Sequence, residues 1–207
     1  MSITIIIVLI TCTVSLAAFQ RKDAMYKLKF IPTSIQSNKE WYRFFTYALV
    51  HADIPHLCIN MFVLYSFGEV VDHFYTDYFG SKSLLYFILL YVGGTVTSVI
   101  PAFEKNKTHH WYSAVGASGA TSAVVFTCIL FNPMAPMGFI FIPFHMPAII
   151  FGLLYLGYSF YMAKKDSDNI GHDAHFFGAL FGIMFTILLD RHIAVEFIEQ
   201  VRSYFNI

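Results

Sequence analysis

Charged residues are scarce in this 207-residue chain: Lys, Arg, Asp and Glu make up 13% of it, while hydrophobic residues make up 57%. Soluble domains carry about 25% charged residues, so this shortage argues against a soluble domain and indicates a membrane protein. The net charge is zero and there is no basic block, so we expect no nucleic-acid partner. Only three cysteines occur, all in apolar stretches without a CxxC pattern, which excludes a disulfide framework.

Six apolar stretches approach the length of about 20 residues that a helix needs to cross a bilayer. They cover residues 3–19, 54–71, 84–101, 115–131, 146–163 and 175–189. The first lacks the positively charged start of a signal peptide and is followed by further spans, so we interpret it as a transmembrane helix. Without repeats, low-complexity tracts or linkers, the sequence predicts a single all-α membrane domain over residues 1–207.

The segment 20–50 mixes basic residues with aromatic residues, as expected of a loop that lies at the membrane interface. Its charge also bears on orientation, because short cytoplasmic loops are enriched in Lys and Arg. The loops after the first, third and fifth stretches carry ten Lys and Arg residues, whereas the opposite side carries three. The charge bias alone therefore predicts that segment 20–50 faces the cytoplasm.

Polar residues inside membrane spans are costly, so each is a candidate for a functional role. Those in the even-numbered stretches are His56, Asn60, Ser118 and His175. Even-numbered spans run in the same direction, so depth can be counted from each residue to the polar end of its stretch. The counts are 12 to 16 residues, or roughly 18 to 24 Å at about 1.5 Å per residue. The four side chains are therefore predicted to form one polar layer within the bilayer.

Ser118 lies in the sequence Gly116-Ala117-Ser118-Gly119, where the glycines allow the backbone to bend. We expect the fourth helix to begin at about Ser118, inside the membrane. Non-helical backbone at that depth is tolerated only beside a water-filled cavity, and the free amides of a helix N-terminus suit a developing oxyanion. His56 and Asn60 are four residues apart and share one helix face, from which both can donate hydrogen bonds.

His175 is followed by Gly178 and Gly182, a stripe of small residues that lets two membrane helices approach closely. Gly119 is the expected facing residue on the fourth stretch. Such a contact would bring His175 within reach of Ser118, as a nucleophile and its general base require.

Together, the segments His51–Met61, Gly116–Gly119 and His175–Gly182 resemble the signature of the rhomboid intramembrane serine proteases in order and spacing. Trp41-Tyr42-Arg43 resembles the family's tryptophan–arginine element, with one extra residue between the two. The resemblance implies a six-transmembrane-helix bundle with an interfacial first loop. It also implies a serine endopeptidase, without cofactor or metal, that cleaves transmembrane segments of other proteins; we expect it in the plasma membrane.

By position, the resemblance makes Ser118 the nucleophile and His175 the base of a dyad without an aspartate. The oxyanion hole would comprise the Ser118 backbone N–H and the side chains of His56 and Asn60. The structural residues near the site would be His51, Gly116, Gly119, Gly178 and Gly182.

The sequence departs from the family pattern at one position near the site. Some members carry an aromatic residue one turn after the serine, against the histidine, and this chain has Ser122 there.

The family also opens its site to the outside, in conflict with the charge bias. On orientation we follow the family and expect the termini and residues 72–83 in the cytoplasm.

Three other functions stay open. The first is a catalytically inactive rhomboid-like protein that binds membrane proteins, although the chain keeps both dyad residues. The second is a metal site built from four histidines, for which no HExxH helix is present; these are His51, His56, His172 and His175. We expect His172 to lie in a loop. The third is a transporter, for which the two halves show no matching broken segments. The sequence leaves the oligomeric state open.

Overall fold

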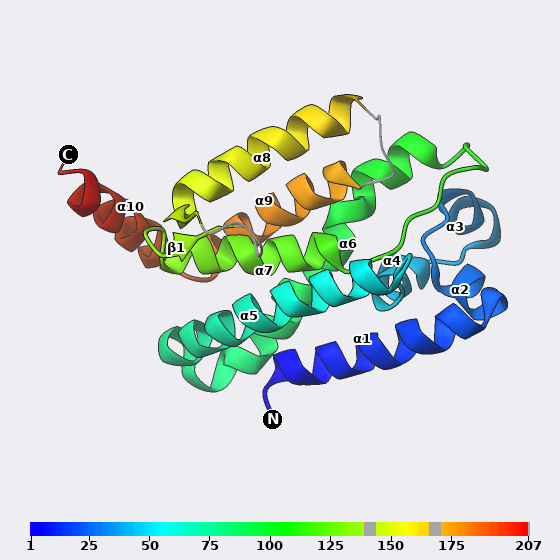
Figure 1. The fold of residues 1–207 in the computed structure, drawn as a ribbon, viewed down its shortest axis with the longest axis horizontal. Helices are drawn as coiled ribbons and strands as arrows, with labels where there is room; N and C mark the ends of the chain where they lie inside the picture. The colour runs from blue at the N-terminus through cyan, green and yellow to red at the C-terminus, as the bar shows by residue number, and fades with distance from the viewer. Residues whose placement is uncertain (139–143, 166–170, 207) are drawn as a thin grey trace.

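The computed structural model, which describes residues 1–138, 144–165 and 171–206, is a bundle of long helices (Figure 1). The long helices are α1 (Ile3–Gln20), α5 (Ile54–Phe79), α6 (Ser83–Asn106), α7 (Ser118–Phe131), α8 (Ala148–Lys165) and α9 (His172–Leu189). The shorter elements are α2 (Lys22–Leu28), α3 (Pro32–Asn38), α4 (Arg43–Thr46), η1 (Tyr47–Leu49), η2 (Gly80–Lys82), β1 (Pro136–Met137), β2 (Met146–Pro147) and α10 (His192–Phe205). The predicted all-α bundle is confirmed; β1 and β2 pair as a short antiparallel ribbon.

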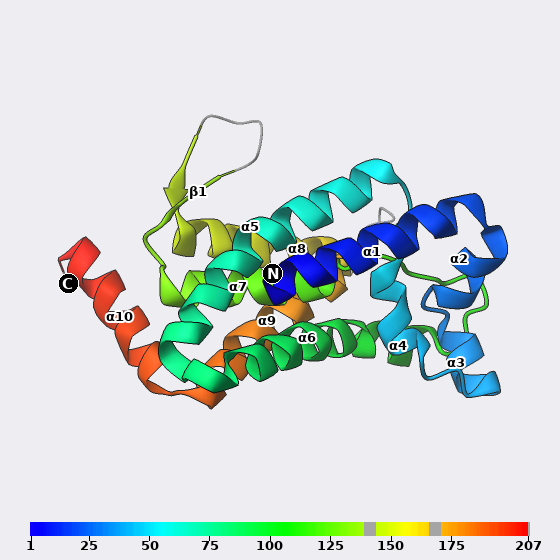
Figure 2. The ribbon, with the colours of Figure 1, turned by 90° about the horizontal axis from the view of Figure 1, so that it is seen from below.

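Helix α7 is the centre of the bundle, and twelve of its fourteen residues are buried. Helices α5, α6 and α9 pack around it, while α1 lies outside α5 and α8 lies outside α9 (Figures 1 and 2). Close packing depends on small residues: a Cβ on Gly94 of α6 would lie 2.8 Å from the Ala123 side chain of α7. The apolar sequence of α7 is therefore explained by burial against three neighbouring helices.

Helices α5, α7 and α9 run in the same direction, as the sequence predicted. Successive contacts between α7 and α9 move in the same direction along both helices: Gly119 contacts Gly178, Ala123 contacts Gly182, and Thr127 hydrogen-bonds Thr186. Between α5 and α7, His56 lies against Gly116, and Phe74 stacks on Phe131 at the other end. The polar residues near the starts of these three helices therefore gather at one end of the bundle.

Several helices extend beyond the predicted apolar stretches. A helix that leaves the lipid can continue into water with polar residues, so the apolar stretch does not mark its end. Helix α5 is capped at its start by Asp53, whose side chain accepts the His56 N–H at 2.7 Å. It continues beyond residue 71 and stops only at Gly80, where φ is 54°. Helix α6 likewise continues through Pro101 to Asn106. The last helix, α10, was not predicted, because it is amphipathic rather than uniformly apolar and its 14 residues are too few to span a bilayer.

Three helical stretches among the described residues are long and apolar enough to cross a membrane: Ile3–Gln20, Ile54–Asn106 and His172–Leu189. The second contains both α5 and α6, and Ser118–Phe131 is a shorter apolar helix. Large apolar side chains on the outer helices are exposed, among them Leu153 and Leu154 of α8 and Leu188 of α9. This surface suits lipid rather than water, while the count of six spans stays a prediction.

The first loop is a folded unit held by Arg43, whose side chain is only 2% exposed. The guanidinium pairs with Glu40 and donates to the backbone carbonyls of Tyr26 and Lys29, at 2.8 and 2.7 Å. The ring of Tyr42 also lies against it, at 5.4 Å from the centroid. The arginine of the tryptophan–arginine element therefore ties α2 to α4.

Candidate functional site

Ser118 is the first residue of α7, as the sequence predicted, and the backbone before it is not helical. The first hydrogen bond of the helix runs from the Thr121 N–H to the Ala117 carbonyl, at 2.9 Å. The amides of residues 118–120 have no carbonyl partner within the helix, as at any helix N-terminus. These donors lie beside the serine hydroxyl, where an oxyanion would form during acyl transfer.

The first loop holds the chain that leads into Ser118. Phe30 and Ala114 form a short antiparallel bridge, with the Phe30 N–H donating to the Ala114 carbonyl at 2.9 Å and the return bond at 3.0 Å. The Gly116 N–H donates to the Tyr47 carbonyl at 3.0 Å. The start of α7 is therefore fixed by residues more than sixty positions earlier in the chain.

Gly116 is a position where only glycine fits. Its φ is 113°, a conformation that side chains rarely adopt, and a Cβ there would lie 2.7 Å from Cε1 of His56. The His56 imidazole thus packs directly over the peptide two residues before Ser118. Gly116 is thus the residue that allows the His56 imidazole to lie against the backbone that leads into Ser118.

Asn60 is buried one turn after His56 on α5, and its side-chain amide donates to the His56 carbonyl at 3.0 Å. His56 itself is half-buried. An amide has two N–H groups, so one donor of Asn60 is left for another acceptor. Both residues share one helix face, as predicted from their spacing.

His51 links three parts of the structure and is fully buried. Its Nε2 accepts the Ala117 N–H at 3.3 Å, and its Nδ1 lies 3.0 Å from the Ser15 hydroxyl of α1. That hydroxyl donates to the Leu49 carbonyl at 2.8 Å, so Nδ1 carries the proton and donates. Burial, with His56 nearby as a second cause, lowers the pKa of His51 to about 4. His51 is therefore a neutral histidine that joins α1 to the start of α7.

Gly119 and Gly178 bring α7 and α9 into backbone contact. A Cβ on Gly178 would overlap the Gly119 carbonyl oxygen and lie 2.8 Å from its carbonyl carbon. A Cβ on Gly182 would similarly lie 2.8 Å from the Ala123 carbonyl carbon. The expected glycine stripe thus faces α7, and it sets the separation between Ser118 and His175.

A third helix completes this contact. A Cβ on Gly119 would lie 2.5 Å from Cβ of Ser98 on α6. The Ser98 hydroxyl donates to the Thr95 carbonyl at 3.0 Å and lies 3.0 Å from the Tyr47 hydroxyl. The contribution of Ser98 was not foreseen, because nothing in an apolar stretch tells which of its small polar residues faces a neighbouring helix.

The imidazole of His175 has an aromatic partner on α8. Tyr155 stacks on it, with ring centroids 6.1 Å apart and an interplanar angle of 23°. The Tyr155 hydroxyl lies 3.2 Å from the Ser122 hydroxyl of α7. Where some family members carry an aromatic residue one turn after the serine, this chain has Ser122, and an aromatic side chain from another helix contacts the histidine instead.

His172 was expected in a loop, and that expectation is wrong. It is the first residue of α9, is 4% exposed, and meets His175 edge-on with ring centroids 5.9 Å apart. Because α9 starts one turn earlier than the apolar stretch, His172 lies on the helix and is buried. Tyr158 of α8 in turn packs edge-on against His172, at 5.4 Å.

Ser118 and His175 are both partly exposed, unlike the small residues packed around them. The structure describes both residues and places no hydrogen bond between them. Such bonds are often long before a substrate binds and tighten in the complex. The arrangement thus offers a partly exposed serine, a partly exposed histidine on the adjoining helix and the free amides of a helix N-terminus.

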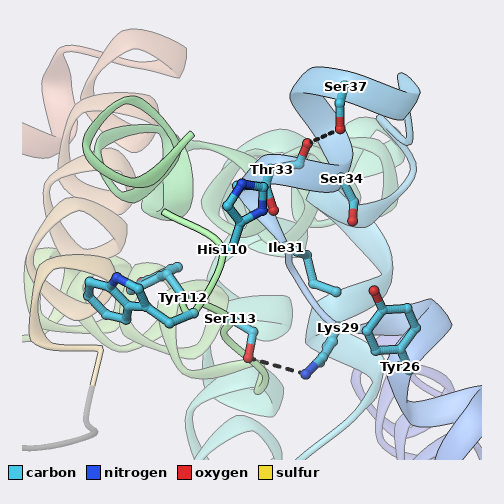
Figure 3. Close-up of a pocket in the computed structure, with 10 residues that line it drawn as sticks. Tyr26, Lys29, Ile31, Thr33, Ser34, Ser37, His110, Tyr112 and Ser113 are labelled. Carbon is cyan, nitrogen blue, oxygen red and sulfur yellow. Dashed lines mark hydrogen bonds between the residues drawn. The ribbon is translucent and has the colours of Figure 1, made fainter. Parts of the chain in front are cut away.

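A polar pocket of the first loop is separate from this site (Figure 3). It lies between residues 26–37 and 110–113, and Lys29 donates to the Ser113 hydroxyl across it at 3.4 Å. Its lining contains neither Ser118 nor His175. We assign it no part in the chemistry.

The four histidines of the metal hypothesis fall into two pairs. The rings of His51 and His56 are 5.0 Å apart, and those of His172 and His175 are 5.9 Å apart. Within the described ranges, no three His, Cys, Asp or Glu side chains are placed to hold a metal ion. The geometry therefore gives the metal hypothesis no support.

The chain is similar to known proteins over most of its length. The family profile of the rhomboid domain matches residues 38–192. The chain is 28% identical to the rhomboid protease GluP of Bacillus subtilis over 83% of its own length and 29% of that protein. It is 30% identical to the mitochondrial RHOMBOID-like protein 12 of Arabidopsis thaliana, over 65% of this chain and 42% of that protein. The chloroplastic Rhomboid-like protein 11 of the same plant is 28% identical, over 79% of this chain and 58% of that protein.

The chain thus spans between about a third and three fifths of the length of these relatives. The profile nevertheless covers most of the chain and includes every residue of the site: His51, His56, Asn60, Gly116, Ser118, Gly119, His175, Gly178 and Gly182. Together with the apolar helical bundle, this match identifies the chain as an integral membrane protein of the rhomboid family.

Proposed function

We propose that this chain is an intramembrane serine endopeptidase that cleaves transmembrane segments of other membrane proteins. One observation carries the proposal: the backbone contact between Gly119 and Gly178, which holds Ser118 and His175 on adjoining turns of two parallel helices. This contact lies beside a partly exposed serine and a partly exposed histidine.

In the proposed reaction, His175 takes the proton of the Ser118 hydroxyl as the oxygen attacks the scissile carbonyl carbon. The resulting oxyanion accepts hydrogen bonds from the Ser118 N–H and from His56 and Asn60. His175 then gives the proton to the leaving amine, and an acyl-enzyme forms on Ser118. Water activated by His175 hydrolyses this ester and restores the free serine. The dyad needs no metal or cofactor.

Substrates would reach the site through the membrane, since the dyad lies on helices with lipid-facing outer surfaces. The plasma membrane is our proposed location, although two relatives are named for a mitochondrion and a chloroplast. We further propose that the first loop faces outward and the termini face the cytoplasm.

Cleavage of a model transmembrane substrate in detergent or liposomes tests the proposal. Ser118→Ala and His175→Ala should each remove nearly all activity, because losing either member of a nucleophile–base unit costs almost the whole effect. His192→Ala is the matched control, since that histidine is 74% exposed on α10. Full activity in either dyad variant would contradict the proposal and favour a rhomboid-like protein that only binds its partners.

A further inference from the structure

Tyr155 occupies a position that connects both helices of the proposed dyad. Its ring stacks on the His175 imidazole of α9, at 6.1 Å between centroids. Its hydroxyl lies 3.2 Å from Ser122, one turn after Ser118 on α7. A side chain of the peripheral helix α8 thus contacts the base directly, and it contacts the nucleophile's helix through its hydroxyl and through its ring, whose centroid lies 5.9 Å from that of Phe126.

We propose that Tyr155 is a positioning residue, which holds the plane of the His175 imidazole in the orientation that proton exchange with Ser118 requires. This inference rests on the proposed protease function. Tyr155 takes no proton itself; it acts by covering one face of the imidazole.

The physical need for such a residue follows from the torsions of histidine. The χ2 torsion of an imidazole is broad and roughly two-fold, so the side chain alone does not fix the ring plane. Offset stacking favours one plane. Tyr155 provides that contact at an interplanar angle of 23°, while His172 meets His175 nearly perpendicular, at 79°. Only Tyr155 of these two therefore defines the plane by a flat contact.

The packing of α8 against α7 determines whether the Tyr155 ring reaches His175. Three residues before Tyr155, a Cβ on Gly152 would lie 3.1 Å from Cδ1 of Ile129 and 3.2 Å from the Phe126 ring. A larger side chain at position 152 would push this part of α8 away from α7. Gly157, on the same helix, offers a contrast because a Cβ there meets nothing within 4 Å. Substitution of Gly152 should therefore displace α8, and the same substitution of Gly157 should leave α8 in place. Neither changes Tyr155 itself.

The first test is kinetic and compares Tyr155→Leu with Tyr155→Phe. We expect the leucine variant to lose roughly 10- to 100-fold in kcat, the scale of a small misplacement of a catalytic group. Its KM should stay within about twofold, as expected when an interaction acts only in the transition state. The phenylalanine variant keeps the ring and should retain most of kcat. Full kcat in the leucine variant, or equal losses in both variants, would overturn the proposal.

Gly152→Leu and Gly157→Leu form the second comparison. Displacement of α8 should lower kcat in the first variant by a factor similar to that of Tyr155→Leu, and the second should match the wild type. Combining Gly152→Leu with Tyr155→Leu should add little further loss, because both act through the same ring. A multiplied loss in the double variant would show that position 152 acts independently of Tyr155.

A third measurement does not depend on activity. In histidine-labelled protein in micelles, a stacked tyrosine should shift the His175 Cε1–H resonance by its ring current; His175→Ala identifies the signal. The shift should persist in Tyr155→Phe and disappear in Tyr155→Leu. An unchanged resonance in Tyr155→Leu would overturn the positioning role. An inactive wild-type protein with the expected shifts would instead contradict the proposed function, so the two failures are distinguishable.

Discussion

Gly119 and Gly178 touch through their backbones, with no room for a side chain between them. Ser118 precedes the first of these glycines, and His175 lies one turn before the second. The distance between the two proposed catalytic groups is therefore set by a contact that neither of them makes. A catalytic site built in this way is sensitive to changes that leave its reactive atoms untouched.

Substitution of Gly178 should abolish the proposed protease activity. Even an alanine Cβ would overlap the Gly119 carbonyl, and leucine would force α7 and α9 further apart. A misplacement of about 1 Å can cost roughly a hundredfold in rate, so we expect a graded loss of kcat from Gly178→Ala to Gly178→Leu. Gly157→Ala, at an open position on α8, is the control. Cleavage rates and thermal unfolding should be measured together, and a fully active, stable leucine variant would remove Gly178 from the account.

Activity should resist chelators. A Ser–His dyad needs no metal, and the described part of the chain holds no group of three His, Cys, Asp or Glu side chains placed to bind a metal ion. Incubation with EDTA should leave the cleavage rate unchanged within error. Loss of activity on chelation, with recovery on adding zinc, would favour the histidine cluster as a metal centre.

Orientation can be measured with single cysteines at Ser37 and Ser81, which are both exposed. The three native cysteines are all free, and exposed Cys58 should first be replaced. We expect an impermeant thiol reagent to label Ser37→Cys in intact cells and to label Ser81→Cys only after lysis. Labelling of position 81 from outside would show that the charge bias, ten basic residues against three, gives the true topology.

His51 should make stability depend on pH. Its pKa is lowered to about 4 in the folded protein, chiefly by burial, whereas an unfolded histidine has a pKa of about 6.5. Between these values the unfolded state binds more protons, so stability is full above about pH 6.5 and falls as pH drops toward 4. His51→Gln offers an acceptor and a donor but does not titrate. Thermal unfolding in detergent should show a weaker acid sensitivity for this variant; identical pH profiles would contradict the role of His51.

Much of the candidate site was predictable because it contains polar residues that are energetically costly in a membrane span and glycines with unusual backbone freedom. Polar side chains in membrane helices cost free energy, so His56, Asn60 and His175 were predicted to have a functional role. Glycines on both sides of Ser118 predicted where α7 begins. Counting along spans of the same direction then placed these groups at one depth, and the parallel packing of α5, α7 and α9 is consistent with that.

The contacts that orient the site were not predictable. Tyr155 lies in an apolar stretch where most aromatic residues face lipid, and only the packing of α8 shows that it faces His175. Burial of His172 likewise depends on a helix start one turn before the apolar residues. Hydropathy also gives no sign of α10 or of the long end of α5, because helices continue into water wherever local sequence permits.

Labelling with a fluorophosphonate probe in detergent tests the central claim most directly, because the probe reacts only with an activated serine and needs no known substrate. The wild-type protein should be labelled. Ser118→Ala should not be, and His175→Ala should be labelled far more slowly because the hydroxyl loses its base. Equal labelling of the wild type and folded Ser118→Ala, or none of the folded wild type, would contradict the assignment of Ser118 as the nucleophile.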